Sequence, residues 1–329
     1  MKKRIVLSVI IALSVLMLIS CSPDTQPIEP TQPPVEESQP TDVPPTEPPP
    51  SPTNTSVPEP TAVPPTETPL PEPTQAPTFE PLPPEPQEID FEAEDGQVLH
   101  GRYYPAAVNP APVLVLMHWA RGDMNDWNEI AFWLQNRGLA GTSLNAGTAP
   151  WLTPDWFPPM FEGQSFAVFT FTFRGCAGRC SFLDKDGWRM DALAAMQTAR
   201  ELEGVDPARV ATFGASIGAD GSPDACGPLN VEFSGTCLGA LSLSPGNYLN
   251  VPYADAVEVL DYQKPPSPVW CVYATGDKHA ADTCKSATGD HYERFEWAGD
   301  YHGMDLLRPD IEPNTMQLIL DWLALLFDL

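Results

Sequence analysis

Basic residues are scarce in this chain of 329 residues, which has 17 lysines and arginines against 44 aspartates and glutamates and a net charge of −27 at pH 7. Setting aside the 3 basic residues of positions 1–21 and the 11 acidic residues of positions 22–86 leaves 33 acidic and 14 basic residues, a net charge of −19, in positions 87–329. Such a surface repels nucleic-acid phosphates and anionic membranes. We therefore expect no nucleic-acid partner, and neutral or cationic substrates ahead of anionic ones.

The beginning of the chain lacks an apolar run long enough to span a bilayer comfortably. Its uncharged apolar run, residues 5–19, is short and follows three basic residues at positions 2–4, which is typical of a signal peptide over residues 1–20. The run ends in LISC, which resembles the lipobox of bacterial lipoproteins, where the signal is removed and the new terminal cysteine is lipidated. The resemblance implies an extracytoplasmic protein anchored to the bacterial cell membrane through Cys21. The alternative is an ordinary secretory signal that contains a cysteine.

Lysine and arginine are absent from residues 22–86, which contain 24 prolines and 11 acidic residues. With so little apolar surface to offset the entropy of ordering, this segment is predicted to be a disordered linker rich in polyproline II structure. Fully extended, it reaches on the order of 200 Å. A ligand for aromatic-lined grooves is the alternative. We therefore expect a folded domain over residues 87–329, long enough to bury a sizeable core.

Besides Cys21 the chain has six cysteines, and no C-x-x-C pair of the kind found in dithiol oxidoreductases. An even number in an exported protein predicts disulfides. Pairing of nearest neighbours is the first expectation, with Cys237 to Cys271 as a competing pair. The six candidates are Cys176, Cys180, Cys226, Cys237, Cys271 and Cys284.

Hydrophobic periodicity predicts an α/β fold. Alternating residues flank the turn at Asp95 and Gly96, which favours a hairpin. Continuous apolar runs that predict buried strands then alternate with stretches of helical spacing, and an amphipathic helix closes the chain. This order implies a mostly parallel sheet covered by helices on both faces. The runs PVLVLMHW, FAVFTFTFRG, RVATFGAS, LGALSLSP, PVWCVYATGD and YERFEWAG are the predicted strands.

Ligands of such sheets bind beyond the carboxyl ends of the strands. There the sequence GASIG, after the third of these strands, forms a G-x-S-x-G motif around Ser216. The motif predicts a sharp turn that lifts a nucleophilic hydroxyl above the sheet, although Ser216 as an ordinary turn residue is the alternative. A serine nucleophile needs a base and an orienting carboxylate. His302 follows the last strand and Asp277 follows the strand before it, so Ser, Asp and His occur in that order, each at a strand end.

These motifs, with the FRGCAGRCS loop at residues 173–181, resemble the α/β-hydrolase superfamily and, within it, the small esterases similar to dienelactone hydrolase. The resemblance implies that Ser216 is acylated, that His302 is the general base and acid, and that Asp277 orients it. An oxyanion hole is expected from the backbone N–H groups of Ile217 and of Ala120. The assignment of Ala120 departs from the family's HG pattern, because Trp119 follows His118.

Several alternatives remain at this point. Asp282 lies in the same predicted loop as Asp277 and competes for the role of acid. His279, Asp282 and Cys284 are a conceivable metal set, but no fourth ligand is evident, so no metal or other cofactor is expected. Gly221 and Pro223, both unfavourable in the interior of a helix, predict that the helix after Ser216 is short or kinked. The aromatic segment at residues 151–161 is predicted to be a structural cover at the opposite rim, and a small cap follows LGALSLSP.

The function expected from these residues is a membrane-tethered serine hydrolase that cleaves small carboxylic esters through an acyl-enzyme. A prolyl-oligopeptidase-like peptidase is one alternative, although the sequence lacks the repeats of a propeller gate. A surface-displayed binding module that keeps the fold without the chemistry is the other. The oligomeric state does not follow from the sequence.

Overall fold

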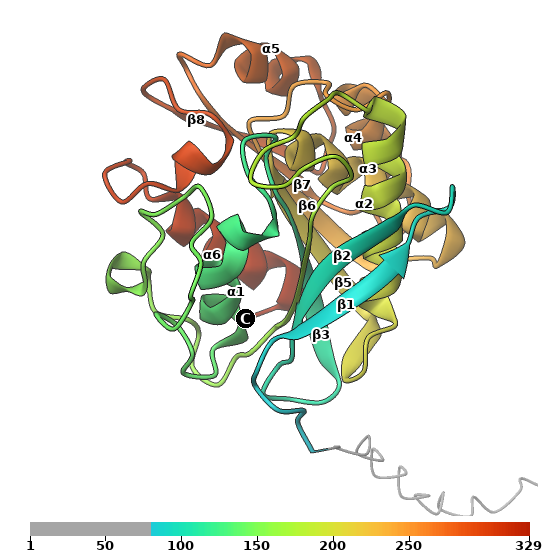
Figure 1. The fold of residues 1–329 in the computed structure, drawn as a ribbon. Coiled ribbons are helices and arrows are strands. Elements are labelled where there is room, and N and C mark those ends of the chain that lie inside the picture. Colours follow the sequence, from blue (N-terminus) through green and yellow to red (C-terminus); the bar gives the residue numbers. More distant parts are fainter. Residues whose placement is uncertain (1–79) are drawn as a thin grey trace, which may run out of the picture. The chain divides into compact units, whose positions relative to one another are not determined.

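The structure, a computed structural model, describes residues 80–329, which contain one eight-stranded sheet (Figure 1). The strand order is β1-β2-β4-β3-β5-β6-β7-β8. The first two strands form the predicted hairpin and pair antiparallel, as do β2 and β4, whereas all later pairs are parallel. The strands are β1 (Gln87–Glu92), β2 (Val98–Tyr104), β3 (Ala111–Met117), β4 (Ala167–Phe171), β5 (Val205–Ala215), β6 (Cys237–Leu243), β7 (Val269–Ala274) and β8 (Tyr292–Trp297).

Helices cover both faces of this sheet, as the alternation of strands and helices predicts. In Figure 1, α1 and α6 lie on one side of the sheet, and α2, α3 and α4 lie on the other. The α-helices are α1 (Asn128–Gln135), α2 (Lys185–Arg200), α3 (Ile217–Glu232), α4 (Tyr253–Tyr262), α5 (Lys278–Ser286) and α6 (Thr315–Phe327). The short 3-10 turns are η1 (Met124–Trp127), η2 (Pro154–Trp156) and η3 (Gly303–Leu307).

Each face of the sheet has its own hydrophobic core because successive side chains of a strand point to opposite faces. Along β3, Val113 and Val115 join the core that contains α2, α3, α4 and α5. The intervening Leu114 and Leu116 join the core that contains α1 and α6. The continuous apolar run that predicted this strand therefore reflects burial on both faces.

Helix α3 corrects one expectation, because it extends over 16 residues with Pro223 and Pro228 in its interior. It is not short. Proline removes a backbone donor and crowds the preceding turn, which disfavours an isolated helix. Here α3 is buried between α2, α4 and the sheet, and the disulfide of Cys226 ties it to β6, so tertiary packing outweighs the local preference.

The six cysteines form three disulfides between nearest neighbours in the chain, the first of the two pairings expected. The pairs are Cys176–Cys180, Cys226–Cys237 and Cys271–Cys284. The paired cysteines are 4, 11 and 13 positions apart in the sequence, respectively. Within residues 80–329, every helix is too short or too polar to cross a membrane.

The aromatic segment at residues 151–161 packs on the core of α1 and α6, with Leu152 buried and Trp151, Trp156 and Phe157 partly buried against it. The segment covers this core, as expected. It also extends beyond the opposite rim, where its position in the sequence had placed it. The Trp151 ring stacks on the guanidinium of Arg308, directly after η3 and so on the side of the catalytic histidine candidate.

Candidate active site

Ser216 lies in a sharp turn between β5 and α3, with φ 54° and ψ −112°. The turn requires glycine on both sides of the serine. A Cβ atom on Gly214 would lie 2.3 Å from the carbonyl oxygen of Gly218, and one on Gly218 would lie 2.3 Å from the carbonyl oxygen of Met117. Because no other residue fits these contacts, the G-x-S-x-G spacing is a steric condition for the turn.

Loops that follow the strands meet around this turn, at the carboxyl ends where ligands of such sheets bind. Hydrogen bonds join neighbouring loops in pairs, and the side chain of Trp119 lies beside Gly303. The joining bonds are Cys180 N–H to Ala120 O, Gly246 N–H to Asp220 Oδ2, His279 Nε2 with Gly246 O, and Gly276 N–H to Gly299 O.

His302 lies between Ser216 and Asp277. Its Nε2 is 2.9 Å from Ser216 Oγ, and its Nδ1 is 2.6 Å from Asp277 Oδ2. An ionised carboxylate only accepts hydrogen bonds, so Nδ1 carries the proton and Nε2 presents a lone pair to the serine hydroxyl. The geometry is that of a nucleophile, a base and an orienting acid.

Asp277 is the carboxylate on the imidazole, and Asp282 is not. Burial alone raises the pKa of Asp277, but its hydrogen bond and charge interaction with His302, and the Ala280 N–H, lower the pKa below its usual value. The carboxylate also caps the first turn of α5. Asp282 lies one turn further along α5 and is exposed. The other members of the conceivable metal set have protein partners, since Cys284 is in a disulfide and His279 contacts Gly246 O.

The two backbone donors expected for an oxyanion belong to segments that flank Ser216. Ile217 is the first residue of α3, and the N–H at this position of a helix has no intrahelical acceptor. Ala120 follows β3, and β3 pairs with β5 so that Met117 is the register partner of Gly214. Trp119 lies beside this turn, because a Cβ on Gly303 would be 3.1 Å from its indole ring and 3.6 Å from Ser216 Cβ.

The loop of Ala120 is supported by residues that the sequence did not reveal as functional. His118 is fully buried, accepts the Phe173 N–H at Nε2 and therefore donates from Nδ1 to Trp119 O. Burial lowers the pKa of His118 to about 4, so the ring is neutral at pH 7. Asp126 accepts from the Trp119 indole N–H at 2.7 Å and from Thr148. The HW pair in place of HG was the one signal that this loop is unusual.

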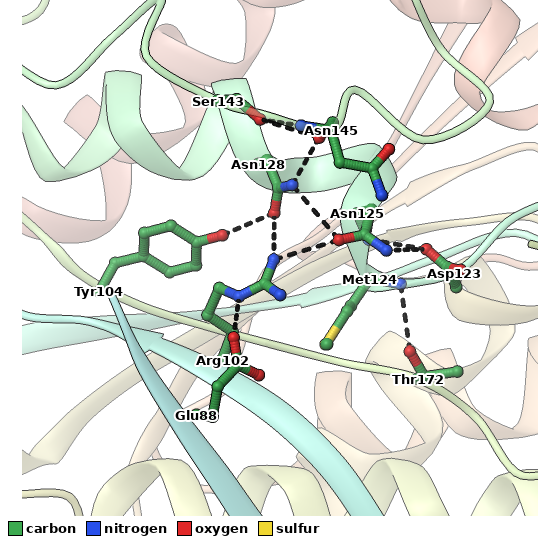
Figure 2. Close-up of polar contacts among 10 residues, drawn as sticks. All are labelled: Glu88, Arg102, Tyr104, Asp123, Met124, Asn125, Asn128, Ser143, Asn145 and Thr172. Atoms are coloured by element: carbon green, nitrogen blue, oxygen red, sulfur yellow. Dashed lines mark hydrogen bonds and ion pairs between the residues drawn. The ribbon is translucent and has the colours of Figure 1, made fainter. Parts of the chain in front are cut away.

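A polar network fixes the far end of the same loop, as Figure 2 shows. Arg102 of β2 donates through Nη1 to the side-chain oxygens of Asn125 and Asn128, and Tyr104 donates to Asn128 as well. The Met124 N–H points to Thr172, directly after β4. The start of α1 is thereby attached to β2, and η1 is attached to β2 and to the residue after β4.

Tyr248 forms a wall of the site that the sequence did not predict. Its ring lies edge-on to the His302 ring at 6.3 Å between centroids, and 5.6 Å from the His279 ring. Asp220, in the first turn of α3, holds this loop by accepting the N–H groups of Gly246, Asn247 and Tyr248. These residues follow the strand LGALSLSP, where the small cap was expected.

Comparison with solved structures decides the fold. The α/β hydrolase GrgF from Penicillium sp. sh18 superposes with a TM-score of 0.51 at 15% identity, over 74% of this chain and 100% of that one. The chain has an α/β-hydrolase fold. The 2,6-dihydroxy-pseudo-oxynicotine hydrolase superposes with a TM-score of 0.50 at 11% identity, over 74% of this chain and 69% of that one.

Sequence comparison gives a partial relationship. No family model matches the chain. The uncharacterised protein YfhR of Escherichia coli K12 is 28% identical over 141 residues, which are 43% of this chain. Its counterpart in Escherichia coli O157:H7 is 28% identical over 132 residues, which are 40% of this chain. The chain thus spans about two fifths of the length of the curated relatives it matches, 42% and 38%.

Proposed function

We propose that this protein is an extracytoplasmic, lipid-anchored serine hydrolase that cleaves small carboxylic esters through an acyl-enzyme. The observation that carries the proposal is the pair of hydrogen bonds on His302, 2.9 Å to Ser216 Oγ and 2.6 Å to Asp277 Oδ2. Chain order, strand ends and these distances agree, although the three residues are far apart in the sequence.

In this mechanism Ser216 Oγ attacks the ester carbonyl while His302 Nε2 takes the hydroxyl proton. The imidazolium that forms is stabilised by the Asp277 carboxylate on Nδ1–H. His302 then gives the proton to the leaving alcohol oxygen, and the acyl group remains on Ser216. Water attacks the acyl-enzyme by the same route, with His302 as base, and releases the acid.

The negative charge that develops on the carbonyl oxygen would be bound by the N–H groups of Ile217 and Ala120. The first lies at the amino end of α3, where the helix dipole also favours negative charge. The second lies in the loop that His118 and Asp126 hold in place. Donors that are already in position stabilise the transition state without reorganisation. Residues that hold the Ala120 loop in place are therefore expected to increase the reaction rate.

The proposal is tested by Ser216→Ala with a short p-nitrophenyl ester. We expect kcat to fall by at least about 10⁴-fold, because the nucleophile is removed. Ser234→Ala, which changes an exposed serine after α3, is the matched control and should keep wild-type turnover. Undiminished turnover in folded Ser216→Ala would remove the proposal.

Two further measurements, fluorophosphonate labelling and peptide cleavage, separate the alternatives. Labelling of Ser216 by a fluorophosphonate supports a serine hydrolase, whereas folded protein that stays unlabelled favours a non-catalytic binding module. Cleavage of peptides without preference for esters would instead favour a peptidase of the prolyl-oligopeptidase type.

A further inference from the structure

The ring of Tyr248 is fixed in position beside the catalytic imidazole. It is perpendicular to the His302 ring, with 6.3 Å between the ring centroids, and lies 5.6 Å from the His279 ring. Its hydroxyl-bearing carbon packs on the backbone of Gly246, since a Cβ there would lie 2.4 Å from Tyr248 Cζ. Asp220 accepts the backbone N–H of Tyr248 at 3.0 Å. The side chain therefore has a defined place at the site, where it is still partly exposed.

The hydroxyl of Tyr248 faces the nucleophile. Burial raises the pKa of Tyr248 to about 12, and the negative charge of Asp277 acts in the same direction. Hydrogen bonding by the Ser216 side chain acts against this rise in pKa, so the two hydroxyls lie close together. With a pKa this high, the phenol keeps its proton at neutral pH. It can therefore donate a hydrogen bond to a substrate bound over Ser216.

Tyr248 and Ala120 approach Ser216 from opposite sides. Strands β3 and β6 are the two neighbours of β5 in the sheet, and Ala120 follows β3 whereas Tyr248 follows β6. In the proposed mechanism the N–H groups of Ile217 and Ala120 bind the carbonyl oxygen, and His302 protonates the leaving oxygen. Because the Tyr248 ring packs beside His302, its hydroxyl lies on the side of the leaving oxygen.

We propose that the Tyr248 hydroxyl donates a hydrogen bond to the alcohol oxygen that leaves the ester. The inference rests on the proposed function, because it concerns the leaving group of the same reaction. When the bond from the acyl carbon to this oxygen breaks, its electron pair passes to the oxygen and the proton comes from His302 Nε2. Tyr248 keeps its own proton and stabilises the charge that the oxygen carries before proton transfer is complete.

Such a donor matters most for esters of aliphatic alcohols. Their alkoxides are strongly basic, so the bond to the acyl carbon breaks only with help from donors at the leaving oxygen. An aryl oxide such as p-nitrophenolate is weakly basic and leaves with little help. The substrate class that this donor fits is therefore alkyl esters, whose alcohol oxygen would lie between His302 and Tyr248.

The variant Tyr248→Phe, assayed with the p-nitrophenyl, phenyl and ethyl esters of one acid, tests the donor. The phenyl ring keeps the contacts with His302 and His279 and loses the hydroxyl. We expect kcat/KM to fall by less than about threefold for the p-nitrophenyl ester and by about 10- to 100-fold for the ethyl ester, the range for a hydrogen bond to a charged acceptor. The phenyl ester should give an intermediate loss.

The matched control is Tyr301→Phe. Tyr301 directly precedes His302, but its ring packs with the core of α1 and α6 on the other face of the sheet. Loss of this hydroxyl should change kcat/KM by less than about twofold for all three esters. Turnover of the p-nitrophenyl ester also shows that each variant is folded with its nucleophile in place.

An equal ratio of wild type to Tyr248→Phe for all three esters would overturn the inference. A common ratio near one would mean that the ring only packs, and a large common ratio would mean that the hydroxyl positions His302 and does not meet the leaving group. Neither result touches the proposed function, which fails only if wild-type protein neither turns over esters nor is labelled at Ser216 by a fluorophosphonate. The two failures are therefore distinguishable.

Discussion

Ser216 has a backbone conformation that L-residues rarely adopt, with φ 54° and ψ −112°. Such residues cost roughly 1–3 kcal/mol and persist where the surroundings determine them. Here the Ser216 N–H donates to Leu243 O of β6 at 2.9 Å, and glycine allows close approach on either side. The hydroxyl of this strained residue lies 2.9 Å from the His302 imidazole.

The substitution Asp277→Asn tests whether Asp277 is the acid of the site. The amide offers Nδ1 no charge and disfavours the tautomer that leaves Nε2 free, so kcat should fall by roughly 10³- to 10⁴-fold. Asp282→Asn, on an exposed position of α5, should keep wild-type kcat. Ester kinetics on the two variants check this, and a larger loss in Asp282→Asn than in Asp277→Asn would contradict the assignment.

Asp220 attaches helix α3 to the loop between β6 and α4 through hydrogen bonds. Its carboxylate is 2% exposed and accepts three backbone N–H groups at 3.0–3.1 Å. Burial raises the pKa of Asp220 to about 6, in spite of these three donors. The loop that places Tyr248 beside His302 thus depends on a carboxylate that titrates near neutral pH.

This pKa predicts a pH dependence of stability. Between the ordinary value of 3.8 and about 6, folded protein holds a proton on Asp220 that unfolded protein releases. The stabilisation is therefore present at low pH and is lost as pH rises through about 6. The difference between the two pKa values corresponds to about 3 kcal/mol.

Urea unfolding of wild type and Asp220→Asn at pH 4.5 and pH 7 measures the effect. The amide does not titrate, so the free energy of unfolding of wild type relative to the variant should fall by about 2 kcal/mol between these two pH values, because part of the stabilisation is already lost at pH 4.5. Other groups titrate in both proteins and cancel. A difference that does not change between the two pH values would show that Asp220 is not the group responsible.

On the scale of the whole molecule, parallel strands with crossovers bring distant segments to one edge of the sheet. Ser216 and His302 are 86 positions apart, and Asp277 and His302 are 25 apart, yet each follows a strand in the run β5 to β8. The domain begins its first strand at Gln87, so a long segment precedes it. Cys21 belongs to that segment and lies outside the described residues.

The proposed tether predicts where the whole protein resides. Full-length chain expressed in a bacterial host should incorporate labelled palmitate and sediment with membranes, whereas Cys21→Ser should incorporate none. Because Cys21 is distant in sequence from the folded domain, the proposed esterase activity per molecule should be equal in both. Palmitate incorporation into Cys21→Ser would exclude this anchor.

Much of the fold was accessible from the sequence because its signals are local. Apolar runs predicted the strands, and glycine at 214 and 218 predicted the turn at Ser216, since both patterns report on immediate neighbours in the chain. The order of Ser216, Asp277 and His302 placed each candidate at a strand end. Helix α3 was the exception, because its prolines are tolerated only through tertiary packing.

By itself, the sequence determined the α/β architecture and the candidate nucleophile with its order relative to an acid and a base. It left the cysteine pairing open between nearest neighbours and a competing pair, and the structure decided for nearest neighbours. Only the tertiary structure decided that Asp277 and not Asp282 meets His302, and that the Cys176–Cys180 loop contacts Ala120. Periodicity and spacing are properties of neighbouring residues. A hydrogen bond between residues tens of positions apart depends on how the helices and strands pack.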